Sequence, residues 1–77
     1  MKARYQVVNY GDGIVELLAQ EQASNGLIVN LGGRTCLTVF DAENQARDGM
    51  KSRGESWSPT YTHEDGVRIA TGQWVII

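Results

Sequence analysis

The order of apolar and polar side chains along the chain predicts short strands on either side of a single helix. Residues 3–10 are rich in aromatic and β-branched types, and the Gly-Asp-Gly sequence at residues 11–13 is typical of a tight turn. If residues 14–20 return as a second strand, Val7 lies opposite Leu17. This register gathers one apolar face for the core: Tyr5, Val7, Val15, Leu17 and Ala19.

Residues 14–24 also fit a short helix, and this alternative stays open. Apolar side chains recur four residues apart, as Ile14 and Leu18 do. Asp12 can cap the first turn of such a helix, and the Asn-Gly pair at residues 25–26 can end it. The strand is favoured because the turn sequence and the hairpin register agree with each other.

A second hairpin is predicted around the Gly-Gly pair at residues 32–33. Apolar segments at residues 27–31 and 35–40 flank this pair, and a two-residue Gly-Gly loop is typical of the turns that join antiparallel strands. The resulting register places Leu31 opposite Arg34.

Residues 41–51 predict the helix. Asp41 is a suitable N-cap, and Phe40 just before it can pack onto the helix as a hydrophobic staple. Cations and Gly54 follow at the other end, where they favour helix termination. Side chains spaced four residues apart predict the buried stripe: Ala42, Ala46 and Met50.

The rest of the chain predicts short extended segments. Trp57 is the large apolar residue of a connection, residues 61–63 are extended, and residues 64–66 form a turn before a strand at residues 67–70. Residues 74–77 carry no charge and form a terminal strand. Because such a strand at a sheet edge would invite pairing, we expect it to be central or to contact a second copy of the chain.

The predicted order of elements, β-β-β-β-α-β-β, is that of a small α+β protein. We expect a single domain over residues 1–77, in which an antiparallel sheet of about 4–6 strands packs against one helix near residues 41–53. With 77 residues, of which 42% are apolar, the chain supports a thin core and leaves little room for an enclosed cleft.

Composition excludes several classes of function. A net charge of −2 argues against direct nucleic-acid binding, and the longest strictly apolar run, residues 74–77, is too short to span a membrane. The first residues lack the apolar segment of a signal peptide, and one cysteine cannot form an internal disulfide. We therefore expect a cytoplasmic protein with no membrane partner.

Three short motifs have residues of catalytic or ligating type, and each has a simpler structural interpretation. His63 lies beside two carboxylates, but neighbours in a strand point to opposite faces. Cys36 has apolar neighbours, which indicate a buried thiol. The Gly-Gly-Arg-Thr sequence at residues 32–35 lacks the rest of a phosphate-binding loop. We expect no catalytic residue, no metal and no cofactor, and hence no enzyme.

A protein-binding surface needs only exposed side chains of suitable chemistry, and the second half of the chain has several. Arg47 and Lys51 lie four residues apart on one helix face, with Arg53 just beyond. Trp57 is either a core anchor or an interface residue. The side chains expected to contact a partner are Glu43, Arg47, Lys51, Arg53, Trp57, Tyr61, Glu64 and Asp65.

Three features define the layout of the chain. A strand opens directly at Met1 and Lys2, the helix starts with Phe-Asp-Ala-Glu-Asn-Gln-Ala at residues 40–46, and a Glu-Asp-Gly turn follows at residues 64–66. This layout resembles that of the very small α+β proteins that phages and other mobile elements encode to block host defences, including anti-CRISPR proteins. The resemblance is one of architecture over most of the chain.

The resemblance implies a stoichiometric inhibitor or adaptor that occupies a surface on a larger nucleoprotein complex, such as a CRISPR effector. Inhibitors of this kind often cover a basic nucleic-acid channel with acidic side chains. The candidates for that role here are Asp12, Glu16, Glu21, Glu43, Glu64 and Asp65.

Two other functions stay open. The cations Arg47, Lys51 and Arg53, together with an aromatic side chain, suit a weak nucleic-acid-binding accessory protein. The uncharged terminal strand suits a structural homodimer or larger homo-oligomer.

Overall fold

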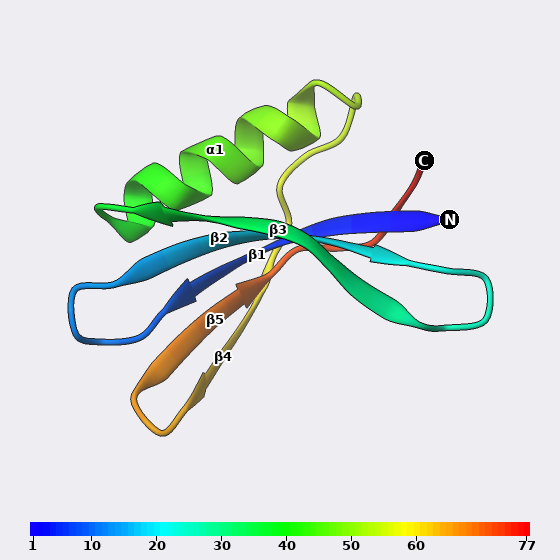
Figure 1. Cartoon of the computed structure of the whole chain (residues 1–77). Coiled ribbons are helices and arrows are strands. Elements are labelled where there is room, and N and C mark those ends of the chain that lie inside the picture. Colours follow the sequence, from blue (N-terminus) through cyan, green and yellow to red (C-terminus); the bar gives the residue numbers. More distant parts are fainter.

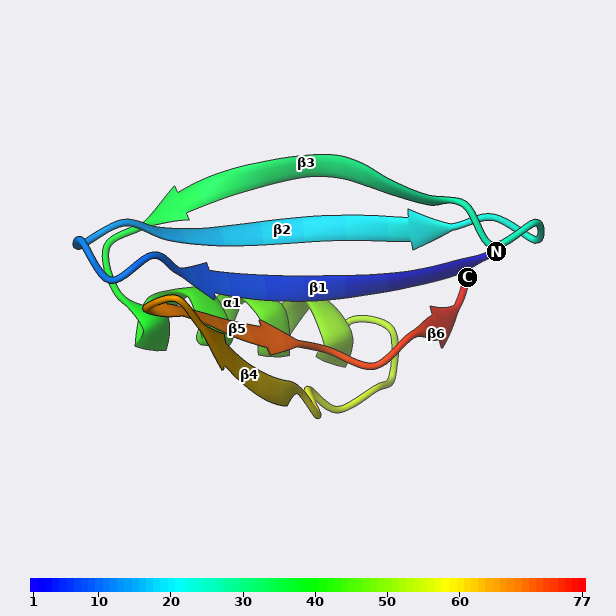
Figure 2. The same cartoon turned by 90° about the horizontal axis from the view of Figure 1, so that it is seen from below.

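A computed structural model describes residues 1–77 and shows one helix packed against a six-stranded antiparallel sheet (Figure 1). The α+β class predicted from the sequence is confirmed. The helix lies on one face of the sheet, and the opposite face stays open (Figure 2). In chain order the elements are β1 (Lys2–Asn9), β2 (Val15–Gln22), β3 (Ile28–Cys36), α1 (Val39–Lys51), β4 (Thr60–Glu64), β5 (Val67–Thr71) and β6 (Val75–Ile76).

The central strand of the sheet is β1. The strands lie in the order β3-β2-β1-β5-β4, and β2 pairs with β1 along its whole length. The other edge of β1 is shared: β5 lies opposite residues 6–9, and β6 lies opposite Lys2 and Ala3. Because β5 takes most of this edge, β6 is a two-residue edge strand, and the prediction of a central terminal strand is wrong. Its role in a contact between two copies stays a prediction.

The hairpin of β1 and β2 confirms the predicted register, with Val7 opposite Leu17. The helix alternative for residues 14–24 is wrong. Side chains stabilise the turn, because Asn9 Oδ1 accepts from the backbone N–H of Gly11 at 3.0 Å and Asp12 Oδ1 accepts from the N–H of Ile14 at 3.1 Å. These bonds satisfy backbone donors that the hairpin ladder leaves free.

The predicted hairpin around residues 32–33 is wrong, because both glycines lie inside β3. The chain turns earlier, where the N–H of Ala23 donates to the carbonyl of Leu27 at 2.9 Å and Gly26 has a φ of 88°. β3 then pairs with β2 rather than folding back on itself, so only three strands precede the helix. The close approach to β2 favours glycine at position 33, where a Cβ would lie 2.8 Å from Leu18 Cδ2.

The helix α1 begins earlier than predicted. Thr38, not Asp41, is the N-cap, and its Oγ1 accepts from the N–H of Asp41 at 3.0 Å. Successive helical residues are rotated by about 100°, so an earlier start places Val39 near the buried stripe and turns Phe40 about 160° away from Ala42. Phe40 is therefore 76% exposed, and the predicted staple is wrong. The chain has no helix long and apolar enough to cross a membrane.

Small side chains hold the helix close to the sheet. The predicted stripe is confirmed, since Ala42 and Ala46 are 0% exposed and Met50 is 1% exposed. Gly49 extends this stripe, because a Cβ there would lie 2.6 Å from Tyr5 Oη. Trp57 packs against the same core from the connection between α1 and β4. The core cluster comprises Val7, Val15, Cys36, Ala42, Ala46 and Ala70.

Met50→Ala is expected to lower the free energy of unfolding by about 2–5 kcal/mol, because it removes buried methylene groups and leaves a cavity under the helix. Denaturant titration measures this change. Leu37→Ala is the matched control: Leu37 is 89% exposed, so its truncation is expected to change stability by less than about 0.5 kcal/mol. Equal effects of the two truncations would contradict the assignment of the core.

Candidate protein-binding surfaces

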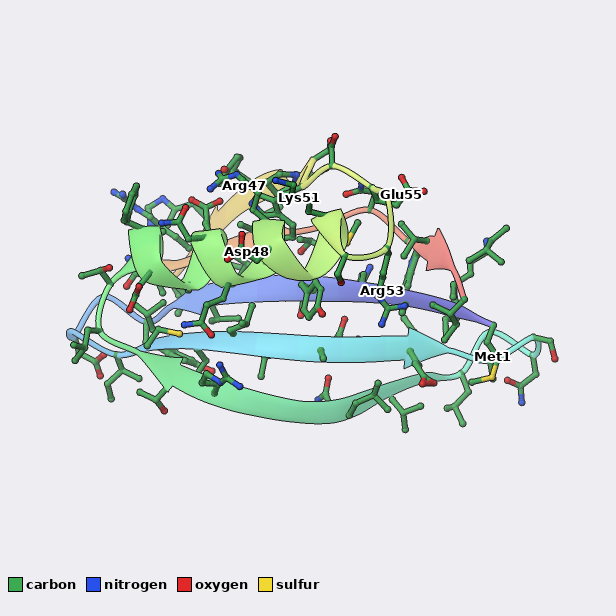
Figure 3. All side chains as sticks on the ribbon, turned by 90° about the horizontal axis from the view of Figure 1, so that it is seen from above. Met1, Arg47, Asp48, Lys51, Arg53 and Glu55 are labelled. Carbon is green, nitrogen blue, oxygen red and sulfur yellow. The ribbon has the colours of Figure 1, made fainter.

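The residues predicted to contact a partner occupy three separate places. Glu43, Trp57 and Tyr61 meet between α1 and β4, with Arg47 beside them. Lys51 and Arg53 lie at the carboxyl end of the helix, and Glu64 and Asp65 lie at the turn between β4 and β5. Figure 3 shows Arg47 and Lys51 on one side of the helix and Arg53 on the other. The eight residues therefore do not form one continuous patch, and their contact with a partner stays a prediction.

Glu43 is the centre of the first group. Its Oε1 accepts from the hydroxyl of Tyr61 at 2.8 Å and from Nε1 of Trp57 at 3.2 Å. The hydrogen bond to this carboxylate is the main cause that raises the pKa of Tyr61, burial and the negative charge add to it, and the charge of Arg47 opposes it. Glu43 thus ties α1 to β4 and to the connection between them.

The cations at the end of the helix do not converge. Arg47 donates from Nη1 to Oδ1 of Asn44 at 2.6 Å, along its own helix. Arg53 lines a small pocket with Tyr5 and Met50 beneath the last helical turn. Lys51 is exposed between them.

Glu64 and Asp65 belong to a surface that the sequence alone does not reveal. The turn of β4 and β5 packs beside the turn of β1 and β2, since a Cβ at Gly11 would lie 3.0 Å from the carbonyl oxygen of Gly66. These two hairpins bring four carboxylates to one end of the molecule, with Arg68 of β5 beside them. The four carboxylates are Asp12, Glu16, Glu64 and Asp65.

Three exposed apolar side chains lie at the same end. Tyr10 is 41%, Ile14 is 47% and Leu37 is 89% exposed. Ile14 and Leu37 directly flank Val15 and Cys36, which lie opposite each other at the ends of β2 and β3. We call the seven residues together the turn-end patch: Tyr10, Asp12, Ile14, Glu16, Leu37, Glu64 and Asp65.

Tyr10 links the apolar and acidic parts of the turn-end patch. A hydrogen bond to the Glu16 carboxylate is the main cause that raises the pKa of Tyr10, with smaller contributions from burial and from the negative charge. Arg53 lies toward the other end of the molecule, on the side of Met1 (Figure 3). Arg68 lies opposite Asn9 and His63, so one cation lies beside the turn-end patch.

His63 and Cys36, which were considered for catalysis or metal binding, lie in strands β4 and β3. His63 is exposed opposite Arg68 on β4, while Cys36 is buried and its Sγ accepts from Nε2 of Gln45 at 3.6 Å. No group of three or more His, Cys, Asp or Glu side chains is close enough to hold a metal ion. No protein-family model, curated protein or solved structure matches the chain.

Glu43→Gln is expected to lower the pKa of Tyr61, because the amide keeps an acceptor oxygen but removes the negative charge that opposes ionisation. A raised pKa in the folded state means that this bond contributes stability below the pKa of the unfolded tyrosine and loses it as the pH rises through the folded value. The ring chemical shifts of each tyrosine, followed by NMR during an alkaline titration, measure the change.

Glu16→Gln is the matched control for that titration. It is expected to lower the pKa of Tyr10 and to leave that of Tyr61 unchanged, because the two carboxylates act on different rings. A Tyr61 titration that is insensitive to Glu43→Gln would show that this hydrogen bond does not form in solution.

Proposed function

We propose that the chain is a non-enzymatic protein-binding module, a stoichiometric inhibitor or adaptor whose turn-end patch docks on a basic surface of a larger nucleoprotein complex, such as a CRISPR effector. The observation that carries this proposal is the grouping of three exposed apolar side chains with four carboxylates at one end of the sheet. The resemblance to small phage inhibitors points in the same direction.

The chemistry of the turn-end patch suits a mixed interface. Exposed Tyr10 and Leu37 provide the apolar area from which binding free energy comes. The surrounding carboxylates attract a basic partner and disfavour neutral or acidic ones. Surfaces that bind nucleic acid are rich in Lys and Arg, so an acidic patch with an apolar centre can occupy such a surface in place of the nucleic acid.

The exposed area of the molecule is sufficient for a binding partner. The accessible surface is 5042 Å² for a chain of 8.5 kDa. A standard interface takes about 800 Å² from each partner, which is roughly a sixth of this surface. A protein of this size can therefore form such an interface with one end of its sheet.

Neutralising the turn-end patch is expected to weaken partner binding. The triple variant Asp12→Asn, Glu64→Gln, Asp65→Asn removes three charges but keeps hydrogen-bond acceptors, and Asn tolerates the positive φ of 52° at position 65. The tagged chain is expected to recover a CRISPR effector in a one-to-one ratio from bacteria that express it, at moderate salt. The variant is expected to recover about tenfold less, since charge governs association.

The control for this experiment removes three charges outside the turn-end patch. Glu21→Gln, Asp48→Asn and Glu55→Gln change the net charge by the same amount, and recovery within about twofold of the unchanged chain is expected. No stoichiometric partner, or equal loss with both triple variants, would refute the proposal.

Leu37→Ala tests the apolar part of the same patch. This variant is expected to keep its stability, as argued for the core, but to bind the recovered partner about fivefold to tenfold more weakly, because an exposed leucine gains burial only in the complex. Titration calorimetry with the purified partner measures the affinity. An unchanged affinity would place Leu37 outside the interface.

A further inference from the structure

The outer edge of β3 is long and unpaired. β3 ends the sheet on one side and spans nine residues, of which only Cys36 is buried. Edge strands of monomeric proteins are commonly short or carry Lys, Pro or inward-pointing charges that prevent further pairing. β3 contains no Lys or Pro, but it has a β-bulge at Leu31, and its one charged side chain, Arg34, points to the helix side and donates to Gln45. By comparison, β4 at the opposite edge has only five residues and follows Pro59.

The register identifies the backbone groups that are free along this edge. The N–H of Ala23 donates to the carbonyl of Leu27, so the polar backbone groups of Leu27 face β2. These groups alternate between the two edges of a strand, so those of Val29 also face β2. The bulge at Leu31, which has no partner in β2, shifts the alternation by one residue, so that the groups of Arg34 face β2 as well. The outward-facing residues are therefore Ile28, Asn30, Gly33 and Thr35.

A groove lies beside this free edge on the helix side of the sheet. Its volume is 490 Å³, and its apolar lining includes Tyr5, Leu17 and Leu31. Gln45 and Asp48 of α1 form one wall, and Arg34 of β3, which donates to Oε1 of Gln45 at 2.7 Å, also lines the groove. Gly32 leaves the β3 side open, because a Cβ there would meet no atom within 4 Å. An apolar cavity of about 150 Å³ already holds a benzene molecule, so this groove has room for an aromatic side chain.

Area decides which strand fits this edge. Two copies that pair only along β3 would share an edge about 30 Å long and about 10 Å thick, which gives roughly 300 Å² per copy. This is well below the area of about 800 Å² that a stable interface takes from each partner. A free extended segment is not limited to the area of the strand edge. It can pair with β3 and also insert a side chain into the adjacent groove, which adds buried area.

We propose that β3 binds an extended segment of a partner protein as an added strand, with one aromatic or large aliphatic side chain of that segment in the groove between β3 and α1. Backbone hydrogen bonds to the outward groups provide affinity, and the groove selects the side chain. The groove is on the helix side of the sheet, and the β3 edge adjoins the turn-end patch only at Thr35, which lies opposite Glu16.

Peptides selected from a random display library on the immobilised full-length chain are the probe for this site. The selected peptides are expected to share one aromatic or large aliphatic residue within an extended sequence. On binding they are expected to slow amide hydrogen exchange at Ile28, Asn30, Gly33 and Thr35, which exchange freely without peptide. Protection elsewhere, or no enrichment of any peptide, would refute the proposal.

Thr35→Pro removes one outward N–H and leaves the bonds to β2 intact, so it is expected to weaken peptide binding by about tenfold or more. Thr35→Ala keeps the N–H and is expected to bind within about twofold. Leu31→Ser, at an exposed position of the groove, is expected to weaken binding several-fold without unfolding the protein. Exchange protection in the unchanged chain keeps the test valid if the proline variant does not fold.

Two further outcomes separate this proposal from its alternatives. A free chain that sediments as a dimer, with the outward β3 amides already protected, would assign the edge to a second copy and overturn the proposal. The turn-end triple variant is expected to bind the selected peptides unchanged. If the β3 edge binds no peptide, the proposed function of the turn-end patch is therefore unaffected. If the turn-end patch binds no partner, the proposal for β3 is likewise unaffected.

Discussion

One helix has to cover a sheet that is much wider than the helix itself. A helix with its side chains is about 10–12 Å across, and strands lie about 4.8 Å apart, so a single helix covers about two strands. In this protein α1 lies over the middle of the sheet and seals a core built from small side chains, with Met50 as the largest fully buried one. The small stripe brings the helix close to β1 and β2. Every other surface of the sheet has to be stabilised in another way.

The two sides of the helix solve this problem differently. Toward β4, Trp57 packs against the core, and Glu43 accepts hydrogen bonds from Trp57 and Tyr61, so side chains bridge the space beside the helix. Toward β3 the bridge is made by polar side chains alone: Arg34 donates to Oε1 of Gln45 at 2.7 Å, and Nε2 of Gln45 donates to Sγ of Cys36 at 3.6 Å. The two glycines of β3 contribute no side chain. The groove beside β3 is the consequence of this asymmetry, and the proposed strand addition would complete the covering.

Local sequence rules predicted the elements that depend on local contacts. The hairpin of β1 and β2 and the stripe of α1 were accessible because turn residues and side-chain spacing determine them. The same rules failed at residues 32–33, because the Gly-Gly pair and the Asn-Gly pair at residues 25–26 are both good turn sequences. Pairing with β2, a contact between distant residues, decides between them. The predicted packing of Phe40 was wrong for a related reason. Because the helix begins at Val39, Phe40 is its second residue, and its side chain points away from the buried stripe.

The acidic residues of this chain differ in role because their surroundings differ. The sequence could identify the role of only some of them. Glu43 was singled out together with Trp57 and Tyr61, and the structure joins these three, but its Oε1 already accepts two internal hydrogen bonds. A carboxylate so occupied stabilises the fold and has less capacity to bind a partner. Glu64 and Asp65 gain their candidate role from the neighbouring turn at Gly11, which is distant in sequence. The candidate binding surface therefore depends on the packing of two turns, which alternation and spacing within single strands do not encode.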